Sequence, residues 1–152
     1  MQRTRVLLVD DYPDALEMWG LYLRSQGYEV VTADDGLRAV ELALSDQADV
    51  IVMDLELPGI TGFEAARRLR QDPRTCKMPL IAATGYSHTK QLDQARQAGF
   101  DSVIVKPCDP GDLVTEIERF RPLPPSSGVV FRSEASGTVL HRIGKSNAAD
   151  DE

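Results

Sequence analysis

Residues 50–62 read VIVMDLELPGITG. The first four are apolar and mostly β-branched, which is typical of a strand buried on both faces of a parallel sheet. Thr61 and Glu64 have the spacing of a capping box, which predicts a helix that begins just after Thr61. Asp54 therefore lies where a buried strand ends and a loop leads into a helix.

The same alternation of a short apolar strand and a segment of helical period occurs five times along the chain. The predicted strands are Arg5–Val9, Glu29–Thr32, Val50–Met53, Leu80–Ala83 and Val103–Val105. The predicted helices are Asp14–Gln26, Gly36–Ser45, Gly62–Asp72, Thr89–Ala98 and Pro110–Arg121. The second strand is less apolar than the others, which indicates an edge position. The sequence predicts an α/β fold in which helices cover both faces of a five-stranded parallel sheet.

The chain has 152 residues, of which 42% are hydrophobic and 27% charged, as in one ordinary domain with an appendage. The composition becomes rich in proline and serine after Arg121. We therefore expect a folded domain over residues 4–121 and a linker and tail over residues 122–152. Within the tail, residues 129–143 have the pattern of a β-hairpin, which needs another surface to dock on. The last residues, 145–152, are expected to be disordered.

Charge and composition argue against several classes of protein. The formal net charge is −7, and an acidic domain repels DNA phosphates, so we expect no nucleic-acid partner. No apolar run approaches the roughly 20 residues of a membrane span, and the N-terminus lacks an apolar signal segment. We therefore expect a cytoplasmic protein with no membrane partner. Cys76 and Cys108 lack metal-binding spacing. A basic run is interpreted as a solvated face: Arg67, Arg68, Arg70, Arg74 and Lys77.

Three carboxylates lie where two of the predicted strands end. Asp10 and Asp11 follow the first strand, and Asp54 follows the third. Ligands of open parallel sheets bind beyond the carboxyl ends of the strands, so we expect these side chains to meet there. Crowded carboxylates raise a pKa or recruit a cation, and Mg²⁺ favours carboxylate oxygens together with phosphate oxygens. Taken alone, Asp10 and Asp11 also fit helix N-capping.

Two further strand ends supply polar groups to the same rim. Thr84 follows the fourth strand with a hydroxyl donor, and Lys106 follows the fifth with an ammonium group. Both groups can pair with phosphoryl oxygens, and with a metal they would neutralise the charge that develops on a transferred phosphoryl group. The nucleophile would then be a carboxylate, and its product an aspartyl phosphate.

Together these motifs strongly resemble the receiver domain of two-component response regulators. The resemblance covers residues 4–121 and is carried by VDD at 9–11, MDLELPGITG at 53–62, ATG at 83–85 and KP at 106–107. It implies the strand order 2-1-3-4-5 and a cis peptide bond before Pro107. It also implies roles for six residues: Asp54 as phosphoacceptor, Asp10, Asp11, Asp54 and the carbonyl of Glu56 as Mg²⁺ ligands, and Thr84 and Lys106 as phosphoryl contacts.

The resemblance implies a phosphoryl-accepting switch of a two-component phosphorelay. A sensor histidine kinase or a histidine phosphotransfer protein would supply the phosphoryl group, and the domain would catalyse its own phosphorylation and dephosphorylation. Since no output domain fits after residue 121, the expected readout is binding to a downstream protein target. Tyr86 and Glu56 are placed to screen the aspartyl phosphate from water, which predicts slow dephosphorylation.

One departure from the family keeps an alternative open. Family members often carry an aromatic residue three positions before the lysine, whereas this chain has Val103. Any switch must then use backbone shifts or another side chain, and a receiver-like interaction module that works without phosphorylation is a second hypothesis. A metal-dependent phosphatase with Glu56 as second acid is a third, against which the lack of a cap domain argues. Flavin binding is disfavoured because the first loop presents carboxylates rather than phosphate donors.

Overall fold

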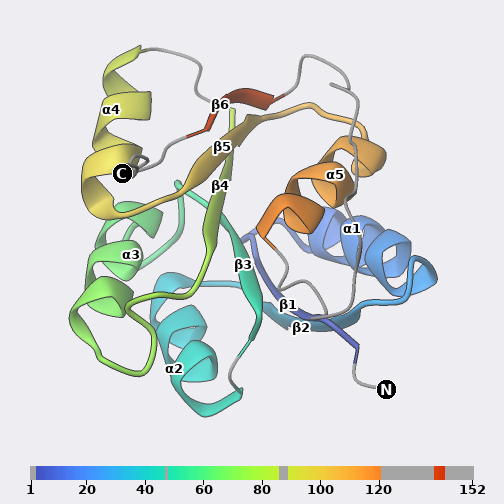
Figure 1. The fold of residues 1–152 in the computed structure, drawn as a ribbon, viewed down its shortest axis with the longest axis horizontal. Coiled ribbons are helices and arrows are strands. Elements are labelled where there is room, and N and C mark those ends of the chain that lie inside the picture. The colour runs from blue at the N-terminus through green and yellow to red at the C-terminus, as the bar shows by residue number, and fades with distance from the viewer. Residues whose placement is uncertain (1–2, 47, 86–88, 121–138, 143–152) are drawn as a thin grey trace, which may run out of the picture.

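The computed structural model describes residues 3–46, 48–85, 89–120 and 139–142, and it places a β-sheet between two layers of helices (Figure 1). The strands are β1 Arg5–Val9, β2 Glu29–Ala33, β3 Val50–Asp54, β4 Leu80–Thr84, β5 Ser102–Val105 and β6 Val139–Arg142. The helices are α1 Pro13–Ser25, α2 Gly36–Asp46, α3 Gly62–Gln71, α4 Thr89–Ala98 and α5 Pro110–Phe120. The predicted bounds of the first five strands hold to within one residue.

The sheet has the order β2-β1-β3-β4-β5-β6, and its first five strands are parallel. This confirms the predicted α/β fold and the strand order 2-1-3-4-5. The strand order reverses between β1 and β3: β2 lies on one side of β1, and the later strands are added on the other side. The carboxyl ends of β1 and β3 are therefore neighbours, with Val9 in register with Met53.

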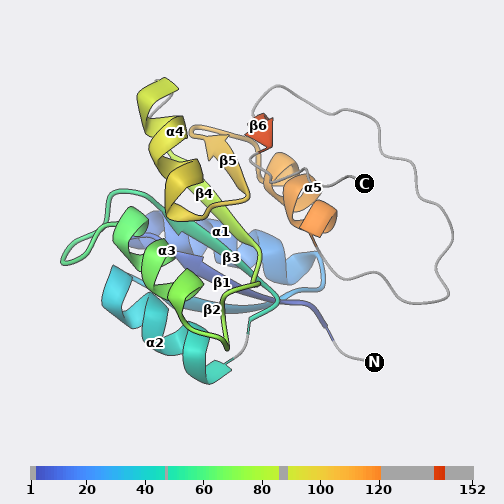
Figure 2. The same cartoon turned by 60° about the vertical axis from the view of Figure 1, so that its left-hand side comes forward.

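Two hydrophobic clusters fill the space between the sheet and the helices. Trp19 and Leu23 of α1 pack with Leu113 and Ile117 of α5 on one face. Buried alanines and leucines of α2, α3 and α4 pack on the other face. Figure 2 shows these three helices on the same side of the sheet. None of the helices in the described part of the chain is long and apolar enough to cross a membrane.

Helix α3 begins just after Thr61, as predicted, and one of the two hydrogen bonds of the capping box is present. The Thr61 Oγ1 accepts a hydrogen bond from the backbone N–H of Glu64 at 3.1 Å. The Glu64 carboxylate forms ion pairs with Arg67 and Arg68 along the helix surface. The hydroxyl cap therefore fixes the point at which the loop after Asp54 becomes helix.

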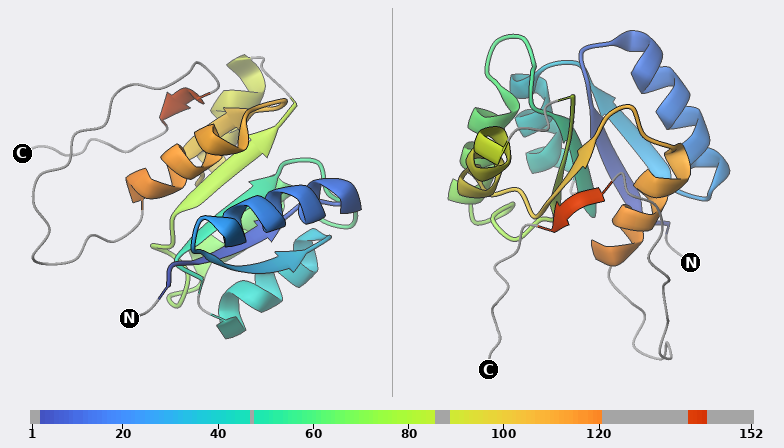
Figure 3. Two further views of the ribbon diagram at one scale, coloured as in Figure 1. Left: turned by 90° about the vertical axis from the view of Figure 1, so that its right-hand side faces the viewer. Right: turned by 90° about the horizontal axis from the view of Figure 1, so that it is seen from above.

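The sixth strand extends the predicted sheet. β6 lies antiparallel to β5, with Ser102 in register with Arg142 and Ile104 with Val139 (Figure 3). The sequence predicted that this segment forms part of a hairpin over residues 129–143, but it did not predict the surface on which the hairpin docks. The proposed first strand, residues 129–132, lies outside the described residues, and the second pairs with the edge of the parallel sheet.

Candidate functional site

The carboxyl ends of β1 and β3 bring three carboxylates together. Asp10 and Asp11 come directly after β1, and Asp54 is the last residue of β3. One oxygen from each of the three lies within 4.8 Å of the others. Asp10 is almost fully buried, Asp54 is partly buried and Asp11 is exposed, so the cluster opens to solvent on the Asp11 side.

Lys106 comes directly after β5 and crosses the rim to reach this cluster. Its Nζ lies 2.7 Å from Asp10 Oδ2 and 3.2 Å from Asp54 Oδ2. The ammonium group therefore bridges two carboxylates that are 44 positions apart in the sequence. The peptide bond from Lys106 to Pro107 is cis, as the family resemblance implied.

A backbone N–H group holds the second oxygen of each carboxylate that Lys106 bridges. Asp10 Oδ1 accepts a hydrogen bond from Tyr12 N–H at 2.9 Å, and Asp54 Oδ1 accepts one from Glu56 N–H at 3.0 Å. Helix α1 begins at Pro13, after an N-cap residue, Tyr12, whose side chain makes no capping hydrogen bond. The capping alternative for Asp10 is therefore wrong, because this carboxylate closes the β1–α1 turn and faces Lys106.

Burial and charge shift the proton affinities of the two bridged groups. Burial raises the pKa of Asp54, although the Glu56 N–H bond and the Lys106 charge act in the opposite direction. Burial alone would lower the pKa of Lys106, but its hydrogen bond to Asp10 and the charges of Asp54 and Asp10 outweigh this effect and raise that pKa. Lys106 is therefore a cation at neutral pH.

Of the remaining predicted residues, Thr84 and Glu56 lie at the carboxyl ends of β4 and β3. Thr84 is the buried last residue of β4, and its carbonyl oxygen accepts a hydrogen bond from Lys106 N–H at 2.8 Å. Glu56 is exposed in the loop after β3. The predicted shielding residue Tyr86 lies outside the described residues. Val103 is fully buried in the cluster beneath α2, α3 and α4, so this position of β5 belongs to the core.

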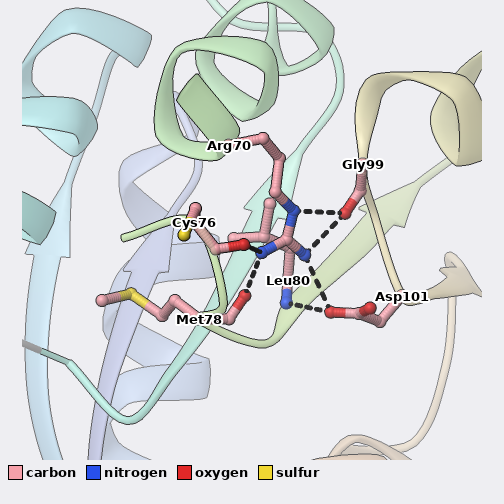
Figure 4. Close-up of polar contacts among 6 residues, drawn as sticks. All are labelled: Arg70, Cys76, Met78, Leu80, Gly99 and Asp101. Carbon is pink, nitrogen blue, oxygen red and sulfur yellow. Dashed lines mark hydrogen bonds and ion pairs between the residues drawn. The ribbon is translucent and has the colours of Figure 1, made fainter. Parts of the chain in front are cut away.

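One residue of the predicted solvated basic face behaves differently. The guanidinium of Arg70 donates hydrogen bonds to the carbonyl oxygens of Cys76, Met78 and Gly99 and pairs with Asp101 Oδ2 at 3.0 Å (Figure 4). The solvated-face prediction is therefore wrong for Arg70. Sequence reasoning missed it because its partners come from two loops at the opposite end of the sheet from Asp54.

The doubly wound sheet and the acidic rim crossed by a lysine together define one class of α/β domain. A family model, the response regulator receiver domain, matches residues 6–118. The chain belongs to the response regulator receiver domain family.

Individual relatives agree with this family assignment. Protein PilH of Pseudomonas aeruginosa is 32% identical over 113 residues, which cover 74% of this chain and 93% of PilH. The chemotaxis response regulator CheY4 of Vibrio cholerae superposes with a TM-score of 0.75 at 30% identity, over 78% of this chain and 99% of CheY4. The receiver domain of the sensor histidine kinase PA1611 from Pseudomonas aeruginosa, which has a magnesium ion coordinated in its active site cleft, gives a TM-score of 0.74 at 31% identity, over 78% of this chain and 98% of that domain.

Other relatives are longer than the matched region. The transcriptional regulator RpaA of Synechocystis is 33% identical over 113 residues, which cover 74% of this chain but 47% of RpaA. For the sensor kinase/phosphatase CqsS of Vibrio cholerae the identity is 35%, and the match covers 74% of this chain but only 17% of CqsS. The chain thus spans less than half the length of these two relatives.

Proposed function

We propose that this protein is a phosphoryl-accepting switch, phosphorylated on Asp54 from a phosphohistidine donor and read out by protein binding. The observation that carries the proposal is the convergence of Asp10, Asp11 and Asp54 on one rim, with Lys106 Nζ within 3.2 Å of Asp54 Oδ2. A carboxylate beside a cation and further acidic ligands is the arrangement that phosphoryl transfer to an aspartate needs.

In the proposed reaction, an oxygen of Asp54 attacks the phosphorus of the donor. The new O–P bond forms as the N–P bond to the donor imidazole breaks, and the imidazole nitrogen keeps the bonding electrons. The ammonium group of Lys106 pairs with an oxygen of the transferred phosphoryl group. The hydroxyl of Thr84, at the end of β4, donates a hydrogen bond to another phosphoryl oxygen. The Glu56 N–H fixes Asp54 Oδ1, which limits the rotation of the carboxylate before attack.

The acidic cluster fits a magnesium ion. Asp10, Asp11 and Asp54 offer three carboxylate oxygens within 4.8 Å of one another, and the loop after Asp54 offers the backbone carbonyl of Glu56. These are hard oxygen donors of the kind that Mg²⁺ prefers. When bound, the ion would supply positive charge opposite the transferring phosphoryl oxygens.

The surface beside the rim supports a protein donor. Tyr12, next to Asp11, is 62% exposed, and Met18 and Leu21 of α1 are 54% and 60% exposed. Large apolar side chains that are exposed to solvent favour contact with a protein surface. We infer that α1 contacts the histidine kinase or phosphotransfer protein that presents the phosphohistidine.

The test is incubation with Mg²⁺ and a small phosphodonor, followed by intact-mass measurement. Wild type is expected to gain one phosphoryl group, which Asp54→Ala and removal of Mg²⁺ with EDTA should both abolish. Asp34→Ala, which removes an exposed carboxylate outside the cluster, is the matched control and should be phosphorylated like wild type. An unmodified wild type would refute phosphoryl acceptance and leave the phosphorylation-independent interaction module as the better hypothesis.

A further inference from the structure

The outer edge of β5 is covered by a segment that is distant in sequence. Asp101 N–H donates to Leu80 O, toward β4, at 2.8 Å. Successive residues of a strand turn their N–H groups to opposite sides. The N–H groups of Ser102 and Ile104 therefore point away from β4. These two residues are in register with Arg142 and Val139 of β6.

We propose that the β5 edge is a docking site for an extended peptide segment, and that residues 139–142 of the same chain occupy it until a partner segment displaces them. An uncovered strand edge presents unpaired N–H and C=O groups and is a template for strand addition. The partner we infer is therefore an extended segment that pairs antiparallel with β5 and is recognised mainly through its backbone.

The pairing of β6 is short enough to be displaced. β6 has 4 residues, and its register with β5 shifts between Val103 and Ile104. A short and irregular ladder contributes few hydrogen bonds, each with a net stabilisation of only about 0.5–1.5 kcal/mol. The β5–β6 pairing is thus weaker than the regular pairings between β1, β3 and β4.

The covalent connection gives β6 its advantage over a free segment. Residues 121–138 join β6 to α5, which ends at Phe120. A covalent tether gives its attached segment an effective concentration on the order of millimolar at a neighbouring site that it can reach. A partner segment must therefore bind more tightly than β6, or β6 must first be released.

The β5 strand connects this edge to the acidic cluster. β5 ends at Val105, one residue before Lys106, which bridges Asp10 and Asp54. A segment docked on β5 pairs with the strand that positions this lysine. The proposal for the edge does not require phosphorylation and is tested separately from it.

The first test is hydrogen exchange on the full chain. Arg142→Pro removes the backbone N–H of the β6 residue that is in register with Ser102, and Ala135→Pro is the matched control outside β6. In wild type and in the control, the Ser102 and Ile104 amides should exchange slowly. In Arg142→Pro we expect their exchange to be at least about tenfold faster, while the Asp101 amide, which bonds to β4, stays unchanged. Equal exchange in all three proteins would overturn the proposal.

The second test is binding of a labelled peptide with the sequence of residues 138–143, TVLHRI. It should bind Arg142→Pro at least about tenfold more tightly than it binds wild type or Ala135→Pro, because β6 no longer competes. Equal affinities, or no binding to any variant, would contradict an occupied docking edge. Light scattering should find wild type monomeric. A dimer that Arg142→Pro dissociates would show that β6 is donated by a second copy and would overturn the intramolecular assignment.

Discussion

A Cβ atom at Gly62 would lie 2.3 Å from the carbonyl oxygen of Asp54 and 2.8 Å from Leu55 Cα. Helix α3 therefore begins against the backbone of the candidate phosphoacceptor, and Gly62 N–H donates to Leu55 O at 2.9 Å. Only a residue without a side chain fits this approach. Gly62 thus sets the position of the loop that carries Glu56, whose N–H holds the Asp54 carboxylate.

The first prediction is that Gly62→Ala displaces this loop. The clash is with backbone atoms, which cannot rotate away, so we expect the free energy of unfolding to fall by about 1–3 kcal/mol. The rate of Asp54 phosphorylation by a small donor should fall as well. Gly111→Ala on α5 is the control, since its Cβ would meet only Tyr22 Oη at 3.8 Å. Urea unfolding of both variants checks the prediction, and equal stabilities would contradict it.

The second prediction concerns the guanidinium of Arg70. Arg70→Lys keeps the charge but loses the planar set of donors that reaches three carbonyl groups and Asp101. Hydrogen bonds to charged groups each stabilise by about 1.5–3 kcal/mol, so we expect a loss in that range. The matched control is Arg74→Lys, because Arg74 is 63% exposed in its pair with Asp72 and should change stability by less than about 0.5 kcal/mol. Similar denaturation midpoints for the two variants would show that the Arg70 contacts contribute little.

The alternation of apolar strands and amphipathic helices was sufficient to predict the parallel sheet. The rule that parallel strands meet ligands at their carboxyl ends was sufficient to place Asp10, Asp54 and Lys106 together. Each of these residues directly follows or ends a buried strand, so their convergence depends on topology rather than on fine packing.

Features that depend on particular long-range contacts were not predictable in this way. Arg70 looks like its exposed neighbours in sequence, and its role follows from carbonyl groups and a carboxylate up to 31 positions away. The close approach of Gly62 to the backbone of Asp54 depends on distances in the folded chain, which the spacing of residues along the sequence does not predict. The pairing of residues 139–142 with β5 likewise needed the three-dimensional sheet, because an extended segment carries no sequence signal for its partner.

A third prediction follows from the environment of Cys108. Burial, followed by the nearby charge of Asp112, raises the pKa of the Cys108 thiol from 9.0 to about 11. The thiolate is the reactive form, so at pH 8 its fraction in the folded protein should be on the order of a hundredfold smaller than in the unfolded chain. In a Cys76→Ser background, alkylation by iodoacetamide should be slower by about this factor than in urea, and should accelerate as the pH rises from 9 toward 11. Equal rates in folded and unfolded protein would rule out the shift.

The last prediction separates the two ways in which the acidic cluster can be neutralised. Lys106→Met leaves Asp10 and Asp54, whose side chains are only 11% and 13% exposed, without their bridging cation. In EDTA we therefore expect the free energy of unfolding to fall by about 1–3 kcal/mol, since a partly buried charge that loses its partner is costly. Lys90→Met, on the exposed surface of α4, should have little effect. Mg²⁺ should then raise the melting temperature of Lys106→Met by more than that of wild type, because the ion replaces the missing positive charge at the cluster. The same Mg²⁺ shift in both proteins would mean that Lys106 and the ion do not act on the same carboxylates.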